Sequence, residues 1–395
     1  MATAPNSSKK GFGARVAHSA GGIFGFWTQV TSGLALDQLW RQFKSEAAES
    51  YGLYSREVDW GAIREKKGLR RFFLSAWALF KVMLMKLAPA RRVLLLIAVA
   101  LFFFPVFGII LLHMKEAEAG DFYEFAAIAL FVLLALELAD RVIMKRDLEI
   151  AREIQRWLVP SAPPAVNGVD IAFATRPANT VAGDYYDVFE RPTAPNASEA
   201  GPLLIVVADV AGKSVPAALL MATFQASLQT LAASPGPLDE LVRALNRYSV
   251  AHSLDGLRFT TAFFAELDPS RRSLTYVGAG HNAPVLRRAD GSIERLTEGG
   301  PPLGMPIGDI VANYDCTRIA VAPGDVLVIF TDGVIEALDQ KGDEYGETRM
   351  IACIQSAGNS AAAPILQQLM NDVDRFVGAT RQHDDITCLV LKITA

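Results

Sequence analysis

The sequence has few of the residues that build secreted or nucleic-acid-binding proteins. It contains only three cysteines in 395 residues, none of them in a Cys-x-x-Cys pair, and five dispersed histidines. This argues against a disulfide framework or a zinc site and fits a reducing compartment. The net charge of −4 leaves no basic excess for a nucleic-acid partner. No long apolar stretch follows the first basic residues, so we expect no cleavable signal peptide.

Two apolar runs indicate membrane helices. The first, Val93–Leu112, has twenty residues and no charged side chain. As a helix it would span about 30 Å, which is the thickness of the hydrocarbon core of a bilayer. The second run, Phe125–Leu136, is shorter and has glutamates at both edges. We therefore predict a transmembrane helical hairpin over residues 93–139.

Charges around these runs predict their orientation. Arginines and lysines are frequent between residues 70 and 92 and again between residues 141 and 152, whereas the connector at 113–121 has one lysine and three acidic residues. Positive residues favour the cytoplasmic side of a membrane. We therefore expect a protein of the inner (cytoplasmic) membrane with both termini in the cytoplasm. Residues 1–92 show no chemical motif, and their role stays open.

A helix-forming segment over residues 140–160 is expected to link the membrane part to the next domain. Ile143, Ile150 and Trp157 recur at intervals of seven, but Asp147 puts a charge in the second heptad position. The segment therefore fits either a homodimer seam or an amphipathic helix packed on its own domain. Pro160 ends the helix, and residues 161–395 form the following domain.

The domain after Pro160 has short apolar runs typical of strands and longer segments typical of helices. The helices come between groups of strands rather than one after each strand. This pattern favours an α+β fold in which helices cover the outer faces of sheets. The expected strands cover residues 169–174, 203–210, 260–267, 273–279, 325–330 and 386–393, and the expected helices cover 216–233, 238–252 and 364–377.

Four acidic motifs lie at the ends of these strands: Asp184 in GDYYDVF, Asp209 in ADVAGK, Asp332 in TDGVIEA, and Asp384 in HDDIT. Each alone is more often a turn, but their order and strand context agree. Several carboxylates that converge on one place repel each other unless cations neutralise them. Ligand sets of oxygen alone suit hard ions such as Mg²⁺ or Mn²⁺.

From about residue 151 onward the chain resembles the metal-dependent PPM/PP2C-type serine/threonine phosphatases, in the bacterial branch typified by SpoIIE and RsbU. The matching phrases are AREIQRWLVP, AGDYYDVF, VADVAGKSVPAALLMA, RFTTAFFAELD, LTYVGAGHNAPVL, PGDVLVIFTDGVIEA and HDDITCLVL. The resemblance implies an αββα sandwich with two Mg²⁺ or Mn²⁺ ions between its sheets. It assigns Asp184 and Asp209 as catalytic metal ligands, and the Val210 carbonyl, Asp332 and Asp384 as further ligands.

The sequence departs from the family pattern near this expected site. Ala182 replaces the first glycine of the usual GGD, Ala211 stands where serine is usual, and Ser214 replaces a glycine. None of these changes removes a carboxylate. The branch lacks the phosphate-binding arginine of the eukaryotic enzymes, and Arg176 is only a candidate for its role. His281 in AGHN is expected to be structural.

The function that follows is a membrane-anchored phosphatase acting on phosphoserine or phosphothreonine. The resemblance points to a phosphorylated partner-switching regulator, of the anti-sigma-factor antagonist type, as the substrate. The chain has neither a GxSxG elbow nor a cysteine with arginine six positions later, so no protein nucleophile is expected. The alternatives are a catalytically silent, membrane-linked module that binds a partner protein, and a metal-dependent nuclease or cyclase. The absence of a basic groove or a P-loop motif opposes the latter.

The predicted topology can be tested with engineered cysteines. A cysteine at Ala117, in the connector, should react with a membrane-impermeant thiol reagent in intact cells, whereas one at Ser50 should react only after lysis. The unaltered chain is the control, since its three cysteines are all expected in the cytoplasm. Labelling at position 50 in intact cells would overturn the hairpin.

Overall fold

The computed structural model describes residues 57–64, 68–112, 116–193, 201–253, 258–268, 270, 272–305 and 312–394, with a few isolated residues between 40 and 55. Most of the N-terminal region and residues 194–200 lie outside the described residues. The chain divides into two units, Met1–Asp140 and Arg141–Ala395. Each unit is described by itself below.

Helices make up the described part of the first unit. They are α3 (Gly61–Arg64), α4 (Leu69–Lys86), α5 (Pro89–Leu112) and α6 (Glu116–Leu158), which continues into the second unit. By length and composition, α5 and α6 are apolar enough to cross a membrane. Large apolar side chains such as Phe131 and Leu134 are 70% and 65% exposed, as expected of surfaces that face lipid. These are long apolar helices that could form a membrane hairpin.

An arginine joins the beginning of α5 to α6. Nη1 of Arg91 lies 2.6 Å from the Asp140 carboxylate and 3.1 Å from that of Glu137. Both carboxylates come after the apolar part of α6, so the charged flanks of the two apolar segments meet. Such a pairing is expected when two helices run antiparallel and keep their charges at one side of the bilayer.

Two sheets form the centre of the second unit, and their strands are antiparallel except for β8, which pairs with β5 in parallel. One has the strand order β1-β11-β10-β6-β7, and the other has β2-β3-β4-β5-β8, with β9 also paired to β5. The strands are β1 (Val169–Arg176), β2 (Tyr185–Glu190), β3 (Leu203–Val210), β4 (Thr260–Asp268), β5 (Ser273–Ala279), β6 (Val285–Arg287), β7 (Ile293–Arg295), β8 (Gly299–Gly300), β9 (Thr317–Ala320), β10 (Val326–Phe330) and β11 (Ile386–Ile393).

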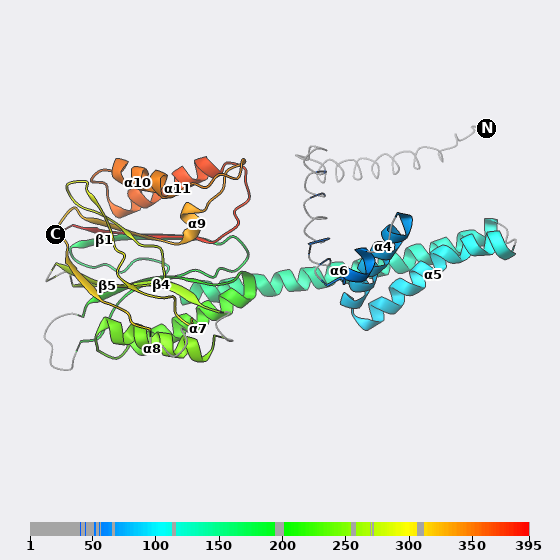
Figure 1. The fold of residues 1–395 in the computed structure, drawn as a ribbon, viewed down its shortest axis with the longest axis horizontal. Helices are drawn as coiled ribbons and strands as arrows, with labels where there is room; N and C mark the ends of the chain where they lie inside the picture. The colour runs from blue at the N-terminus through cyan, green and yellow to red at the C-terminus, as the bar shows by residue number, and fades with distance from the viewer. Residues whose placement is uncertain are drawn as a thin grey trace, which may run out of the picture. The chain divides into compact units, whose positions relative to one another are not determined.

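Helices cover the outer face of each sheet (Figure 1). Those on the β2-β3-β4-β5 sheet are α7 (Ser214–Ala232) and α8 (Leu238–Ala251), and those on the other sheet are α9 (Asp332–Ile335), α10 (Glu347–Ser356) and α11 (Ala362–Val377). Three apolar cores result, one between the sheets and one under each helical layer. The expected αββα sandwich is therefore confirmed. Helix α7 is also apolar enough to cross a membrane, but here it packs on a sheet.

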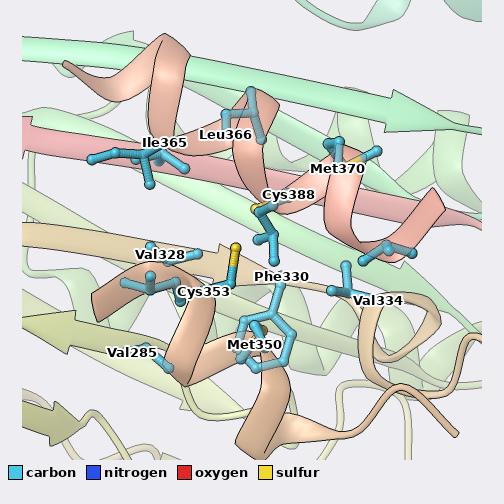
Figure 2. Close-up of a cluster of buried hydrophobic side chains, with 14 of the residues drawn as sticks. Val285, Val328, Phe330, Val334, Met350, Cys353, Ile365, Leu366, Met370 and Cys388 are labelled. Carbon is cyan, nitrogen blue, oxygen red and sulfur yellow. The ribbon is translucent and has the colours of Figure 1, made fainter. Parts of the chain in front are cut away.

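The central strands are buried on both faces because each lies between a helical layer and the other sheet. All eight residues of β11 are buried, which explains its nearly continuous apolar sequence. Figure 2 shows one of the outer cores, where Val328, Phe330 and Cys388 of the strands pack near Met350 and Met370 of the helices. This packing fixes the end of β10, beyond which the acidic residues of the candidate site begin.

Candidate active site

Strand pairing brings the four predicted aspartates to one end of the sandwich. In the first pair of strands, Tyr185 is opposite Ala208, so the next positions, Asp184 and Asp209, are neighbours. In the other sheet Asp332 follows β10 and Asp384 precedes β11, and these two strands are antiparallel neighbours. The loops that carry the carboxylates therefore meet at the same ends of the two sheets.

The electrostatics of these carboxylates show that they interact. Burial raises the pKa of Asp209 to about 7, and the negative charges of Asp332, Asp384 and Asp385 add to the shift. Asp184 is 4% exposed, and burial followed by the charge of Asp209 raises its pKa well above the ordinary value. Burial also raises the pKa of Asp332, with Asp384 as the next cause. Carboxylates from both sheets therefore share one buried, negatively charged region.

A buried threonine orients Asp184. Oγ1 of Thr331 donates a hydrogen bond to Oδ2 of Asp184 over 2.9 Å, and it accepts one from the backbone N–H of Thr387 over 3.0 Å. Thr331 is fully buried at the end of β10, so this contact joins one sheet to the other. Thr331 was not predicted as a site residue, although its position between an apolar strand and Asp332 indicates that it lies near the carboxylates.

Asp385 holds the loop before Asp184 in place. Its Oδ2 accepts a hydrogen bond from the N–H of Gly183 over 2.6 Å, and its Oδ1 accepts one from the N–H of Ala178 over 2.7 Å. A Cβ atom on Gly183 would lie 3.1 Å from the carbonyl oxygen of Val210, so this loop runs close to that carbonyl. Because both oxygens of Asp385 bind backbone amides, its role is to shape the site.

The linker helix also reaches this loop. The Gln155 side chain of α6 donates to the Ala182 carbonyl over 2.7 Å and accepts from the Ala182 N–H over 3.0 Å. A side-chain amide thus pairs with a backbone amide two residues before Asp184. The heptad pattern of this helix predicted an apolar face, but it did not predict the contact of Gln155 with the Asp184 loop.

Asp384 has a lysine as its counter-ion. Nζ of Lys213 lies 2.9 Å from Oδ2 of Asp384 and 2.6 Å from the backbone oxygen of His383. Lys213 immediately precedes α7, where Ser214 has a φ of 61°. The family usually has glycine at this position, and glycine adopts this left-handed conformation without strain. Serine therefore keeps the local backbone shape at a cost of roughly 1 kcal/mol.

The residues fit a hard divalent cation in chemistry, although they form no finished coordination shell. Among the described residues, no group of three or more His, Cys, Asp or Glu side chains is arranged to hold an ion. The donors are nevertheless all oxygens, and burial, followed by mutual repulsion, raises the pKa of Asp184, Asp209 and Asp332. Mg²⁺ or Mn²⁺ would relieve this repulsion.

Other candidates from the sequence lie in supporting positions. Nδ1 of His281 is hydrogen-bonded to Oγ1 of Thr261 over 3.0 Å, and burial lowers the pKa of His281 to about 4, so this side chain is neutral at pH 7. Arg176, the candidate phosphate ligand, is instead bound to both carboxylate oxygens of Asp374. Arg191, directly after β2, is buried in an ion pair with Glu266.

Comparison with known proteins identifies the family of the second unit. Residues 199–394 match the family described as Stage II sporulation protein E (SpoIIE). Phosphoserine phosphatase RsbU of Bacillus subtilis (strain 168) is 27% identical over 253 residues, which cover 63% of this chain and 70% of RsbU. Protein IcfG of Synechocystis sp. is 27% identical over 285 residues, covering 66% of this chain but only 43% of IcfG. The chain thus spans less than half the length of that relative.

A solved structure has the same fold. The SiaA-PP2C domain of Pseudomonas aeruginosa aligns with a TM-score of 0.55 at 21% identity, covering 64% of this chain and 98% of that domain. The alignment supports the assignment of the sandwich in the second unit. The C-terminal domain of this chain belongs to the SpoIIE family of PP2C-type serine phosphatases, in the RsbU-like bacterial branch.

Proposed function

We propose that the chain is a membrane-anchored protein serine/threonine phosphatase that depends on two Mg²⁺ or Mn²⁺ ions. The observation that carries the proposal is the meeting of four aspartates from both sheets, with raised pKa values at three of them. Asp184 and Asp209 would hold the ions, and the Val210 carbonyl, Asp332 and Asp384 would complete the ligand set. When bound, the ions would activate a water molecule for attack on phosphorus and offset the charge of the phosphate.

The residues of the chain would orient this centre. Thr331 fixes one oxygen of Asp184, and Lys213 binds one oxygen of Asp384. Directing the free carboxylate oxygens in this way is the usual task of residues around a metal site. Gly183 lets the backbone of the Asp184 loop approach the Val210 carbonyl, where a larger residue would be crowded.

The cysteines do not support a covalent mechanism. Burial raises the pKa of Cys388 to about 12 and that of Cys316 to about 11, and it also raises the pKa of Cys353. The thiolate is the nucleophilic form of cysteine, so all three are poor nucleophiles near pH 7. The proposed mechanism is therefore direct attack by water rather than attack by a cysteine thiolate.

The substrate would be phosphoserine or phosphothreonine on a regulatory protein of the partner-switching type. The likeness to a phosphoserine phosphatase, RsbU, supports this class of substrate. The apolar helices α5 and α6 support an anchor in the cytoplasmic membrane, with the phosphatase domain in the cytoplasm. Ile143, Ile150 and Trp157 of α6 are 59%, 46% and 76% exposed, which supports a homodimer through the linker helix.

The proposal predicts activity that requires metal. The full-length protein in detergent should hydrolyse para-nitrophenyl phosphate with Mn²⁺, and Asp209→Asn should lower the rate by roughly a hundredfold or more because a charged metal ligand is lost. Phosphate release from phosphorylated candidate regulators should exceed that from unrelated phosphopeptides. Full activity in EDTA would refute the metal centre. No turnover under any metal would favour the silent binding module.

The proposal also predicts how pH affects the metal-free domain. The folded pKa of Asp209, about 7, lies above its ordinary 3.8, so the folded state holds the proton more tightly. Stability should therefore fall as pH rises from about 4 to 7. Asp209→Asn lacks this charge and should become more stable than the wild type above pH 7, by on the order of 2–4 kcal/mol. Urea unfolding of residues 141–395 in EDTA measures the difference.

The control for this measurement is Asp343→Asn, since Asp343 is an exposed residue in the turn before α10. It should change the free energy of unfolding equally at every pH. With saturating Mn²⁺ the wild type should have the larger free energy of unfolding, because the ions stabilise the wild type and not Asp209→Asn. If the free energy of unfolding of Asp209→Asn depends on pH in the same way as that of the wild type, the repulsion described for the site would be contradicted.

A last prediction concerns the linker helix. Gln155→Ala removes both hydrogen bonds to Ala182 and should raise the Mn²⁺ concentration needed for half-maximal activity by roughly 10- to 100-fold, as losses of supporting contacts do in other metal sites. Arg156→Ala, on the exposed side of the same helix, is the matched control. If the two variants need the same Mn²⁺ concentration for half-maximal activity, the linker helix does not support the metal site and only connects the membrane part to the phosphatase domain.

A further inference from the structure

A small pocket lies beside Asp384, on the side of the α11 layer. It has a volume of about 280 Å³, an apolar part formed by Ala337, Val373, Val377 and Ile386, and a charged rim that includes Glu336 and Arg381. These residues belong to, or pack against, the outer core that is partly shown in Figure 2. Asp384 itself forms part of the pocket wall. The pocket and the candidate metal centre therefore share a residue.

The wall of the pocket is held by hydrogen bonds to the loop that carries Asp384. Nε2 of Gln382 donates to the backbone oxygens of Arg176 and Asp384, both over 2.7 Å. The Arg176 side chain, which also lines the pocket, is fixed by Asp374. The pocket is thus formed before any ligand binds, which lowers the cost of binding.

We propose that this pocket binds one apolar side chain of the substrate protein, close in sequence to its phosphorylated residue; the inference rests on the phosphatase function proposed above. At about 280 Å³ the cavity is below the usual range of roughly 300–1,000 Å³ for pockets that hold drug-sized ligands, and its size suits a leucine, methionine or phenylalanine side chain. Because Asp384 borders both sites, the apolar residue must lie near the phosphate. An extended peptide advances about 3.3 Å per residue, so we expect it within about four positions.

This pocket would give the enzyme a selectivity that the metal centre lacks. Two ions and four carboxylates recognise a phosphate group whatever protein carries it. An apolar side chain in a preformed cavity adds binding energy only for sequences that place such a residue correctly. Discrimination by one apolar pocket is typically about 10- to 200-fold.

The first experiment needs no mutation. The full-length protein in detergent with Mn²⁺ is given phosphoserine peptides of alanine and serine, in which a single leucine is moved from position −4 to +4. Leucine at one or two positions should lower KM by roughly tenfold relative to the leucine-free peptide. Equal KM values for all leucine positions would overturn the proposal. Hydrolysis of para-nitrophenyl phosphate tests the phosphatase function separately, and its absence would defeat that function and this inference together.

Substitutions at Val377, at the end of α11, then locate the effect. Val377→Trp should fill the pocket, raise the KM of the preferred leucine peptide to that of the leucine-free peptide, and leave para-nitrophenyl phosphate hydrolysis unchanged. Ile319→Trp is the matched control, since Ile319 is also a half-buried residue packed on a core but lies on β9 of the other sheet. It should leave the leucine preference intact.

Two further results complete the test. Val377→Ala widens the pocket and should shift the preference from leucine toward phenylalanine, which keeps the inference testable if the tryptophan variant fails to fold. A loss of para-nitrophenyl phosphate hydrolysis equal to the loss of peptide hydrolysis in a folded Val377→Trp protein would overturn the proposal. In that case the pocket only supports Asp384.

Discussion

Repulsion among buried carboxylates is the constraint around which this domain is built. Asp184, Asp209 and Asp332 all have raised pKa values because burial and neighbouring negative charges disfavour their ionised forms. Left alone, such groups would move apart or take up protons. The carboxylates cannot easily move apart, because Asp209 lies in β3 and the others adjoin strands of the same sheets. Strands β3, β10 and β11 are fixed in buried layers. Without cations these groups hold protons more tightly than usual, and Lys213 and, in the proposed site, divalent ions would offset their charge.

The remaining polar contacts keep the loops in place against this repulsion. Asp385 binds two backbone amides of the segment before Asp184, Thr331 binds Asp184 itself, and Gln155 binds Ala182 from the linker helix. None of these contacts needs a metal ion, so the loops can be ordered before the ions bind. Hydrogen bonds to charged groups contribute about 1.5–3 kcal/mol each, enough to offset part of the repulsion.

Sequence reasoning predicted the layers and the carboxylates better than their supports. Strands such as β3 and β11 were readable because burial on both faces makes them continuously apolar, and membrane-length runs such as that in α5 are unmistakable. Short strands such as β7 and β8 have no periodicity to read, and they are recognised only by their pairing, β7 with β6 and β8 with β5. Gln155 and Thr331 escaped notice because their importance depends on partners that are distant in sequence.

Two of the three departures from the family pattern, Ala182 and Ser214, can be explained by the geometry of the loops that carry them. Ala182 replaces glycine but remains buried, and Gln155 binds its backbone, so a methyl group there does not displace the loop. Ser214 retains a backbone conformation with a φ of 61° that suits glycine better. A residue held in this region persists only when its surroundings determine its shape. Lys213, which contacts Asp384, comes directly before Ser214, so the left-handed turn at Ser214 adjoins the residue that pairs with Asp384.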